Sequence, residues 1–493
     1  MFETAEVGNR IDKRAFAREA PKVREALLKA QRALAGAGFS VVLHIGGVEG
    51  AGKSETVNHL LAWLDARGIQ THAVWDSTDE ERERPFMWRF WRLLPATGRI
   101  GIFLGSWYTA PIIDRVFGRL TAAGLDQALD RILEFEKMLS RENVLVVKLW
   151  MHLSKRAQEE RLRALESSRK TRWRVRKVDW KFFRKYDDFR SVSEHALRKT
   201  GTAWSPWHIV AAEDERYRTL TVTRTILAAL TERLAAWKEN AGKKIPAAPL
   251  PRPARPNVIS RLDLKLALTD KVYERRLEKL QGDLNRLTRR LYDRRRSMIL
   301  VFEGPDAAGK GGTIRRLTSC IDARLYEVIS VAAPTDEERA HPYLWRFWRH
   351  LPRLGRVTIY DRSWYGRVLV ERIEGFCQAS DWQRAYAEIN AFEEQLTTFG
   401  IVVLKFWLAI GADEQLRRFK DRETTPYKQY KITEEDWRNR KRWDAYEAAA
   451  CDMIERTSTE AAPWIPVEAN DKNWARIKVM KTVAVRLKRE LRR

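Results

Sequence analysis

The chain has 493 residues, which is too many for one hydrophobic core and predicts two to four domains. Its formal charge of +26 predicts an anionic partner, which nucleic acid or any other polyanion would satisfy. The N-terminus lacks the apolar core of a signal peptide, no apolar run approaches membrane-spanning length, and the three cysteines lack metal-ligand spacing. We therefore expect a cytoplasmic protein without disulfides, zinc or a membrane partner.

The first half of the chain alternates apolar, strand-like runs with helical stretches. The runs are residues 40–45, 100–103 and 144–150. Strands that alternate with helices predict an α/β fold, in which a parallel sheet is sandwiched by helices and phosphates bind beyond the strand ends. The first run leads into Gly47–Ser54, whose spacing fits the phosphate-binding loop G-x-x-x-x-G-K-S.

A proline-rich segment separates the two halves. Residues 241–261 contain five prolines, a composition that favours a semi-rigid extended linker. We therefore predict an N-terminal domain over residues 1–240, this linker, and a C-terminal domain over residues 262–493. Leucines between Leu277 and Leu291 then recur at three- and four-residue spacing, which predicts a helix with one apolar face.

A second phosphate-binding loop follows the apolar run 298–302. Gly304 and the pair Gly309-Lys310 fit the spacing G-x-x-x-x-G-K, and a helix follows. Such a loop presents backbone N–H groups and a lysine to a chain of phosphates. The residues expected to bind phosphate around Lys310 are Gly304, Ala307, Ala308, Gly309, Gly311, Gly312 and Thr313.

The second loop departs from the general motif at one position. Gly311 stands where a Ser or Thr hydroxyl would hold magnesium, so other oxygen atoms must bind the metal. The candidate ligands are Asp306, inside the loop, and Asp361, which follows the apolar run 357–360 as a carboxylate at the end of a second strand should.

The two halves repeat one another. Lys310 lies 257 residues after Lys53, and the same offset relates Trp88–Arg92 to Trp345–Arg349 without a gap. Two copies at so long a period indicate the tandem duplication of a whole domain. The aromatic residues of this Trp-Arg-Phe-Trp-Arg block persist in both copies, which favours packing in the core.

The copies differ where catalysis is expected. Three charged residues of the second copy are replaced by uncharged residues in the first. At the repeat offset, Leu104, Gly105 and Ala110 align with Asp361, Arg362 and Arg367. The first copy therefore lacks a metal carboxylate and two cations that would stabilise a transferring phosphoryl group, and we predict that it is catalytically silent. The predicted catalytic residues are Asp306, Lys310, Asp361, Arg362 and Arg367.

The region after the second loop's helix is where an acceptor nucleotide would bind. Arg346 and Arg349 are candidates for contacts with its phosphate. The turn at residues 334–338, with Asp336, would either read the base or ribose or cap a helix. A matching turn in the first copy leans toward capping.

A basic segment at residues 417–442 falls where a lid would lie. A charge run of this kind is either a solvated helical face or a binding surface for an anion. Because a long polyanion needs cations beyond one nucleotide site, we favour Lys428, Lys431 and Arg438 as contacts to the donor phosphates.

Three motifs of the second copy resemble the second family of polyphosphate kinases. They are residues 302–313, 341–352 and 360–372, and the resemblance spans both halves. A tandem fusion resembles the polyphosphate:AMP phosphotransferase subgroup, which makes ADP from AMP with inorganic polyphosphate as the donor. The resemblance implies a thymidylate-kinase-like fold with a helical lid, dependence on Mg²⁺, and one active copy in each chain.

Other functions stay open at this point. One is transfer to ADP or GDP, or polyphosphate synthesis from a nucleotide, within the same family. Another is an ATP-dependent nucleotide kinase, and a third is a nucleic-acid-binding protein, which charge and abundant tryptophan suggest. The last leaves Asp306, Lys310 and Asp361 without a purpose, so we do not expect nucleic acid as a partner. A homo-oligomer is left open.

Overall fold

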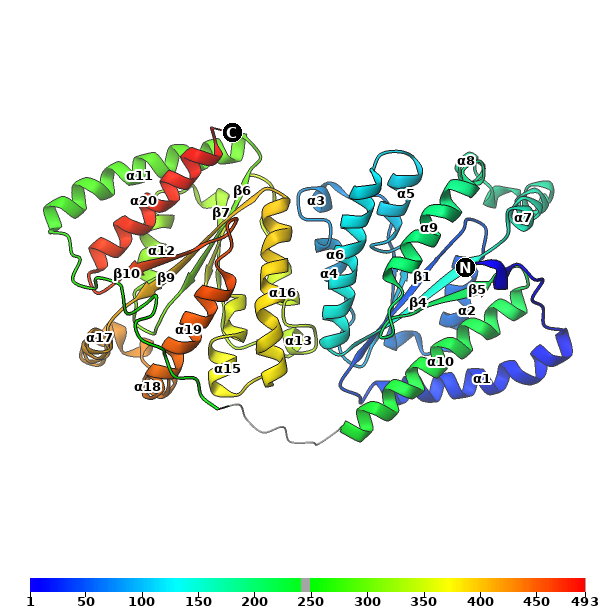
Figure 1. Cartoon of the computed structure of the whole chain (residues 1–493), viewed down its shortest axis with the longest axis horizontal. Coiled ribbons are helices and arrows are strands. Elements are labelled where there is room, and N and C mark those ends of the chain that lie inside the picture. Colours follow the sequence, from blue (N-terminus) through cyan, green and yellow to red (C-terminus); the bar gives the residue numbers. More distant parts are fainter. Residues whose placement is uncertain (241–248, 493) are drawn as a thin grey trace. The chain divides into compact units, whose positions relative to one another are not determined.

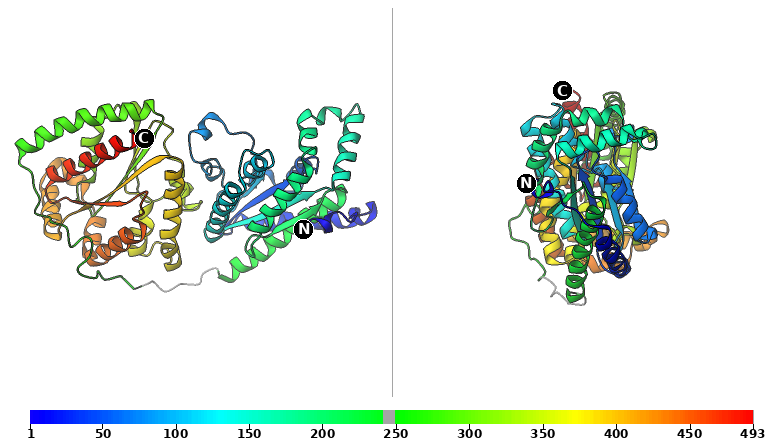
Figure 2. Two further views of the ribbon diagram at one scale, coloured as in Figure 1. Left: turned by 45° about the horizontal axis from the view of Figure 1, so that its top comes forward. Right: turned by 90° about the vertical axis from the view of Figure 1, so that its right-hand side faces the viewer.

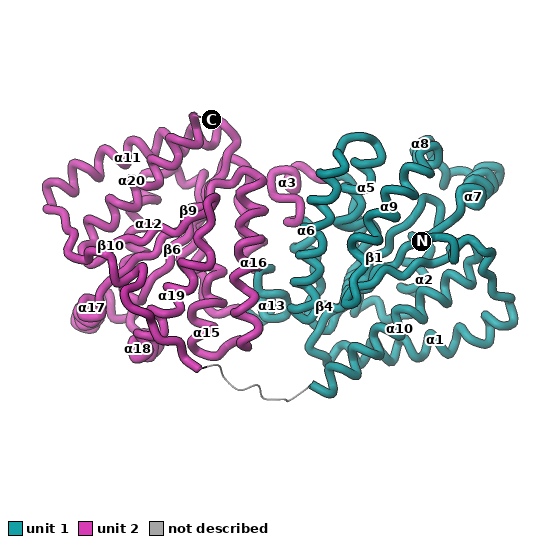
Figure 3. Tube along the Cα trace, viewed as in Figure 1, with its two compact units in different colours: residues 1–76, 89–243, 335–345 teal, residues 77–88, 244–334, 346–493 magenta. Residues whose placement is uncertain are grey.

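The computed structural model describes residues 1–240 and 249–492. The chain forms two compact units (Figure 3): unit 1 comprises Met1–Asp76, Arg89–Lys243 and Thr335–Trp345, and unit 2 comprises Ser77–Trp88, Lys244–Pro334 and Arg346–Arg493. Residues 241–248 of the predicted linker lie outside the described residues, and the predicted domain bounds stay a prediction.

Each unit contains one parallel five-stranded sheet, so the predicted α/β fold is confirmed. In unit 1 the order is β2-β3-β1-β4-β5, with strands β1 (Ser40–Gly47), β2 (Ile69–Ala73), β3 (Ile100–Leu104), β4 (Val144–His152) and β5 (Trp207–Ala211). In unit 2 the order is β7-β8-β6-β9-β10, with strands β6 (Ser297–Glu303), β7 (Tyr326–Ser330), β8 (Val357–Asp361), β9 (Ile401–Ala409) and β10 (Trp464–Glu468).

The sequence repeat extends to the register of the strands. Val41 pairs with Ile100 in unit 1, and Met298 pairs with Val357 at the matched positions of unit 2. The central strand β6 is buried along its whole length, because helices cover both faces of its sheet. This burial explains why the central strands are continuous apolar runs in the sequence.

The α-helices before residue 241 are α1 (Lys13–Leu34), α2 (Lys53–Trp63), α3 (Asp79–Arg82), α4 (Trp88–Trp91), α5 (Thr109–Val116), α6 (Ala122–Arg141), α7 (Lys155–Ser167), α8 (Lys177–Phe183), α9 (Tyr186–Thr200) and α10 (Glu215–Asn240). Those after residue 248 are α11 (Asp270–Asp293), α12 (Lys310–Thr318), α13 (Asp336–Arg339), α14 (Trp345–Trp348), α15 (Val370–Glu374), α16 (Ala379–Thr398), α17 (Ala412–Thr424), α18 (Glu434–Lys441), α19 (Trp443–Thr457) and α20 (Lys472–Glu490). Short 3-10 helices are η1 (Glu3–Ala5), η2 (Ala66–Gly68), η3 (Arg172–Arg174), η4 (Ala323–Leu325), η5 (Trp364–Arg367) and η6 (Pro426–Lys431).

Helices α11, α12 and α20 cover one face of the unit 2 sheet, and α16 and α19 cover the other (Figures 1 and 2). Leu287 of α11 and Val479 of α20 belong to the same hydrophobic core as Leu404 of β9. In unit 1, helices α1, α2 and α10 cover the face that corresponds to the one covered by α11, α12 and α20 in unit 2. Among the described residues, none of the helices combines the length and the apolar character that crossing a membrane requires.

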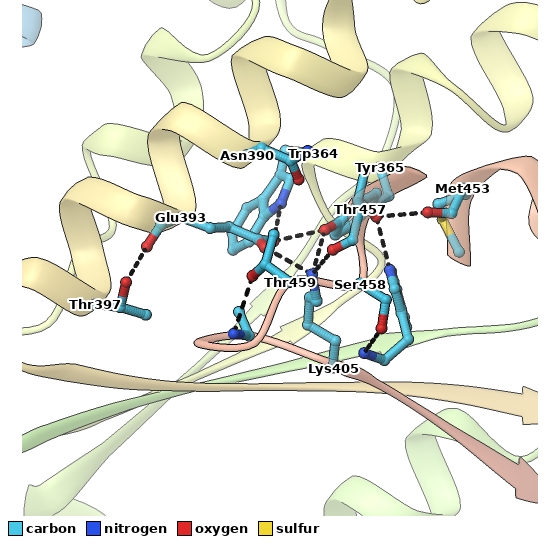
Figure 4. A network of polar contacts seen from close by, with 12 residues as sticks. Trp364, Tyr365, Asn390, Glu393, Thr397, Lys405, Met453, Thr457, Ser458 and Thr459 are labelled. Carbon is cyan, nitrogen blue, oxygen red and sulfur yellow. Dashed lines mark hydrogen bonds and ion pairs between the residues drawn. The ribbon is translucent and has the colours of Figure 1, made fainter. Parts of the chain in front are cut away.

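A buried polar network fixes the segment that follows β8 (Figure 4). Lys405 Nζ lies 2.7 Å from Glu393 Oε2 of α16, and both side chains are buried. Tyr365 Oη and Trp364 Nε1, just after Asp361-Arg362, donate to Glu393 Oε1 at 2.6 and 3.1 Å. The network therefore anchors the loop that carries the two predicted catalytic residues to α16 and β9.

Unit 1 contains the same network. Lys148 Nζ lies 2.7 Å from Glu136 Oε2, and Tyr108 Oη donates to Glu136 Oε1 at 2.7 Å. Since the network is present in the copy that lacks Asp361, Arg362 and Arg367, it belongs to the fold. The aromatic blocks are buried in both copies, for example Trp91 and Trp348, which confirms their predicted core packing.

Candidate active site

Strand β6 ends at Glu303 and runs directly into the second phosphate-binding loop. Gly304 has a φ of +145°, and a Cβ there would lie 2.5 Å from the carbonyl oxygen of Leu408, so a larger residue has no room against β9. Gly309, with a φ of +101°, caps α12, which begins at Lys310. The first N–H groups of α12 have no helical partner and are available to an anion, as a phosphate cradle requires.

Lys310 lies inside the loop. Its Nζ donates to the carbonyl oxygens of Gly304 and Pro305, at 2.6 and 3.2 Å. Burial, helped by the nearby Arg362 guanidinium, lowers the pKa of Lys310, while three surrounding carboxylates favour the charged form. A phosphate group in the loop would compete with the two carbonyls for this ammonium group.

Asp306 is the most constrained carboxylate of the site. Arg362 Nη2 donates to its Oδ1 at 2.7 Å, and Asn439 Nδ2 of α18 donates to its Oδ2 at 2.9 Å. Burial alone would raise the pKa of Asp306, but Lys310, Arg362 and the Asn439 hydrogen bond together hold it below its ordinary value. Asp306 is therefore an ionised anchor for Arg362.

Asp361 ends β8 and is the available carboxylate of the site. Its side chain makes no hydrogen bond or ion pair to the described residues, and its Oδ2 would lie 3.8 Å from a Cβ on Gly311. Asp361 thus lies beside Gly311, the position at which the general motif has a Ser or Thr hydroxyl that binds magnesium. Magnesium commonly takes one or two carboxylates and otherwise water and phosphate oxygens, so Asp361 fits that role. In the described parts of the chain, no three acidic, histidine or cysteine side chains cluster as a metal site.

A cavity of about 690 Å³ opens on one side of the loop, and we call it the basic cavity. It is lined by residues 306–313 of the loop, by Asp361, and by cations from four helices and from the segment after β8. The cations are Lys310, Arg315, Arg316, Arg362, Arg418, Arg422, Lys428, Lys431, Lys472 and Arg476. Such a density of positive charge suits a polyanion longer than one phosphate.

A second cavity, of about 380 Å³, adjoins the start of the loop at residues 303–306, and we call it the apolar cavity. Aromatic and aliphatic side chains form most of its wall: Leu262, Leu264, Leu369, Val370, Trp407, Trp443 and Tyr446. Flat aromatic walls with a few polar groups are typical of sites for planar ligands. Asp306 and Arg362 line both cavities, so this ion pair stands at the junction between them.

The structure brings most of the predicted catalytic and lid residues together. The basic cavity is lined by Asp306, Lys310, Asp361 and Arg362 and by six of the seven predicted phosphate-binding positions. The seventh, Gly304, lines the apolar cavity. Lys428 and Lys431 line the basic cavity as well. Two residues line neither cavity: Arg367 pairs with Glu371 Oε2 at 2.8 Å, and Arg438 pairs with Glu374 Oε2 at 3.0 Å. Their catalytic and lid roles stay predictions.

The predicted acceptor residues do not line either cavity. Arg346 Nη2 donates to the carbonyl oxygen of Ala332 at 3.1 Å. Asp336 is the first residue of α13, its side chain is 98% exposed, and Thr335 forms a capping box with Glu338. The turn at residues 334–338 therefore caps a helix, and an acceptor role for Arg346, Arg349 and Asp336 stays a prediction.

Sequence reasoning missed several residues of the site. Asn439, Trp443 and Tyr446 reach it from α18 and α19, and Leu262 reaches it from the chain after the linker. The internal repeat carried a signal for two of them, because Asn439 and Tyr446 are matched by Phe182 and Phe189 in the first copy. No local pattern marks Leu262, which lies beside the loop only through the fold.

The first copy's loop is filled by its own side chains. Arg218 of α10 packs against Gly52, where a Cβ would lie 2.4 Å from its Nη1. Arg218 Nη2 and Arg161 Nη2 donate to Glu55 Oε2 at 2.8 and 2.9 Å. Glu55 takes the place of Gly312, so a carboxylate occupies the start of α2 where the second copy is open. This ion cluster, with Leu104 in place of Asp361, supports the prediction that the first copy is silent.

The family model for polyphosphate kinase 2 (PPK2) matches residues 10–238 and 267–493. A polyphosphate:AMP phosphotransferase of Pseudomonas aeruginosa is 52% identical over 485 residues, which cover 98% of each chain. Another, of Pseudomonas syringae pv. tomato, is 48% identical over 488 residues, 98% of this chain and 97% of the relative. A crystal structure described as polyphosphate kinase 2 from Pseudomonas aeruginosa PA01 aligns over 100% of both chains with a TM-score of 0.90 and 49% identity. The resemblance is thus confirmed, and the chain belongs to the polyphosphate kinase 2 family, with one family domain in each half.

Proposed function

We propose that the chain transfers the terminal phosphate of inorganic polyphosphate to AMP, giving ADP, at the loop of its second copy. One observation carries the proposal: the ion pair of Asp306 and Arg362 joins a basic cavity to an apolar one. A polyanionic donor and a nucleotide acceptor would meet at this junction. The relatives named polyphosphate:AMP phosphotransferase, similar over nearly the whole chain, support the same reaction.

The donor belongs in the basic cavity. Polyphosphate carries a charge on every residue and no feature other than its charge and length, so recognition must come from cations spaced along a track. Lys310 and the loop amides hold the transferring phosphate, and Lys428 and Lys431 hold phosphates farther along the chain. Nucleic acid is a poorer fit, because the cations converge on one loop instead of following an extended surface.

The acceptor belongs in the apolar cavity. Trp407, Trp443 and Tyr446 offer ring faces to a base, and Arg362 lies where the 5′-phosphate of AMP would point toward the donor. This assignment places AMP beside residues other than Arg346, Arg349 and Asp336. It needs no histidine, because none of the described histidines lines the two cavities.

Phosphoryl transfer in this arrangement is an in-line displacement. An oxygen of the AMP phosphate attacks the terminal phosphorus, the bond from that phosphorus to its bridging oxygen breaks, and polyphosphate leaves one unit shorter. The attacking oxygen is already ionised, so no general base is required, and Asp306 serves to orient Arg362. Arg362 and Lys310 stabilise charge on the transferring group. Magnesium, which Asp361 would hold, supplies further shielding of the phosphate oxygens when bound.

ADP formation from AMP, polyphosphate and magnesium tests the proposal. The intact protein should turn over, Asp361→Asn should lower turnover by at least about a hundredfold, and Lys53→Ala in the first copy should keep it. Consumption of ADP or GDP but not AMP would move the chain to another branch of its family. Activity with ATP alone as donor would refute polyphosphate as the substrate. The magnesium requirement, a cytoplasmic location and a homo-oligomeric state are parts of this proposal that need their own measurements.

A further inference from the structure

Unit 1 contains a cavity of its own, of about 310 Å³, beside the first copy's loop. It lies at the position of the apolar cavity of unit 2, because the lining residues correspond at the repeat offset. Ring and aliphatic positions are kept as such: Trp150, Tyr186, Phe189, Ile112 and Ile113 match Trp407, Trp443, Tyr446, Leu369 and Val370. The silent copy has therefore kept a flat, largely apolar pocket of similar size.

The polyphosphate side of the first copy has not been kept. The cluster of Glu55, Arg161 and Arg218 fills the start of α2 and the underside of Gly52. Lys53 Nζ lies 3.2 Å from Glu49 Oε2 and also donates to two loop carbonyls. The cluster therefore fills the space that a long polyanion would need. Lys53 also differs from Lys310 by its ion pair with Glu49, whereas both lysines donate to two loop carbonyls. A ligand of this cavity must therefore lack a long phosphate chain.

The floor of the cavity carries a polar group that the second copy lacks. His44 lies in the middle of β1, is 1% exposed, and lines the cavity, while the matched residue in β6 is Val301. Neither of its ring nitrogens has a hydrogen-bond partner among the described residues. Its Nε2 would lie 2.8 Å from a Cβ on Gly46, which also lines the cavity. A buried ring without partners normally costs stability, so a ligand that bonds to it would explain it.

The electrostatics of this floor favour a neutral heterocycle. Burial, helped by the charge of Lys148, lowers the pKa of His44 to about 3, so the imidazole is neutral and offers one donor and one acceptor. The base of a nucleoside offers the same combination on its edge. At the cavity, Arg176 is an exposed cation whose guanidinium lies 5.7 Å from the ring centroid of Trp75. It could pair with a single phosphate.

We propose that the cavity of the first copy binds a purine nucleoside monophosphate, with the base on His44 between aromatic walls and the phosphate toward Arg176, and does not transfer phosphate to it. The transfer machinery is missing at this position, since Leu104 and Gly105 replace Asp361 and Arg362. The inference goes beyond the proposed function, because it concerns a second nucleotide site that takes no part in the reaction.

Equilibrium dialysis of the full-length protein against AMP, without polyphosphate, tests the inference. Two AMP molecules should bind each chain. Filling the unit 1 cavity with Ile113→Trp should leave one, filling the matched cavity of unit 2 with Val370→Trp should also leave one, and the double variant should bind none. A wild-type chain that binds one AMP, lost in Val370→Trp and kept in Ile113→Trp, would overturn the proposal.

A milder variant guards against misfolding. His44→Val installs the residue that β6 already carries at this position, so the strand should fold normally. Loss of one neutral hydrogen bond should weaken AMP binding at one of two sites by about fivefold. Unchanged affinity at both sites would refute the role of His44. Polyphosphate-dependent ADP formation, measured on Ile113→Trp, keeps the two proposals apart: turnover tests the second copy, and the binding stoichiometry tests the first.

Discussion

Asn439 of α18 donates a hydrogen bond from Nδ2 to Oδ2 of Asp306, at 2.9 Å, and so ties the lid to the phosphate-binding loop. Tyr446 Oη donates in turn to Asn439 Oδ1 at 3.1 Å and contacts Glu374 at 3.3 Å. The loop carboxylate that orients Arg362 is thus held by a polar chain that begins in α15. Lid position and loop geometry are therefore coupled.

The first copy replaces this chain with phenylalanines. Phe182, Phe189 and Phe117 stand at the positions of Asn439, Tyr446 and Glu374, and the rings of Phe117 and Phe182 pack edge to face at 5.5 Å. We expect Asn439→Phe to lower kcat for ADP formation by about tenfold or more, because Asp306 loses one of its two partners and the lid loses its contact with the loop. Steady-state kinetics with saturating AMP and polyphosphate measure this.

The control for this variant is Lys441→Ala in the same helix. Lys441 is exposed and lines neither cavity, so its removal changes lid charge without touching the polar chain. If both variants lowered kcat to a similar degree, the effect would come from the charge of α18, and the coupling through Asn439 would be wrong.

Glu303 makes the stability of unit 2 depend on pH. Burial raises the pKa of this carboxyl, although Ser363 Oγ donates to it at 2.8 Å. Because the folded state favours the protonated form, the stabilising contribution is full below the carboxyl's ordinary pKa and is lost as pH rises through the folded value. Glu303→Gln should therefore raise Tm at pH 7 by about 2 °C, corresponding to about 1 kcal/mol, and by less at pH 5. A lower Tm at pH 7, measured by calorimetry, would contradict this.

The sequence predicted those residues of the site that are marked by local sequence patterns. Gly304, Lys310 and Asp361 were found because loop spacing and strand ends are local features, and the parallel sheet places strand ends at one edge. Arg438 was chosen from charge alone, and its pairing with Glu374 depends on α15, which no local pattern brings near α18. The aromatic walls of the apolar cavity were missed as well, because the sequence alone does not distinguish a tryptophan that lines a cavity, such as Trp407 or Trp443, from one that packs in the core.

The buried pair of Lys405 and Glu393 makes the two units separable in a stability experiment. Lys405→Met leaves Glu393 as an uncompensated buried charge, which typically costs about 3–5 kcal/mol. The matched change in unit 1, Lys148→Met, leaves Glu136 as a buried charge without its ion-pair partner. Each variant should lower a different calorimetric transition, by about 10 °C.

Heat inactivation then identifies the unit that carries activity. Lys405→Met should lose polyphosphate-dependent ADP formation at the lower temperature of its own weakened transition, whereas Lys148→Met should keep its activity beyond the first transition. Adding Glu393→Gln to Lys405→Met should recover part of the loss, because the stranded charge is removed while a hydrogen-bond acceptor remains. Equal inactivation of the two single variants would show that the units do not unfold independently.

The lid lysines Lys428 and Lys431 should affect binding of the donor polyphosphate but not binding of the acceptor AMP. Lys428 and Lys431 line the basic cavity, so replacing either with alanine should raise KM for polyphosphate by about threefold at low salt, with KM for AMP unchanged. The difference from the wild type should shrink at 0.5 M salt, where charges are screened over about 4 Å. Arg438 is paired with Glu374 outside the cavity, and Arg438→Ala should leave KM for polyphosphate nearly unchanged. A rise as large as that for Lys428→Ala would place Arg438 on the polyphosphate track, as the sequence alone predicts.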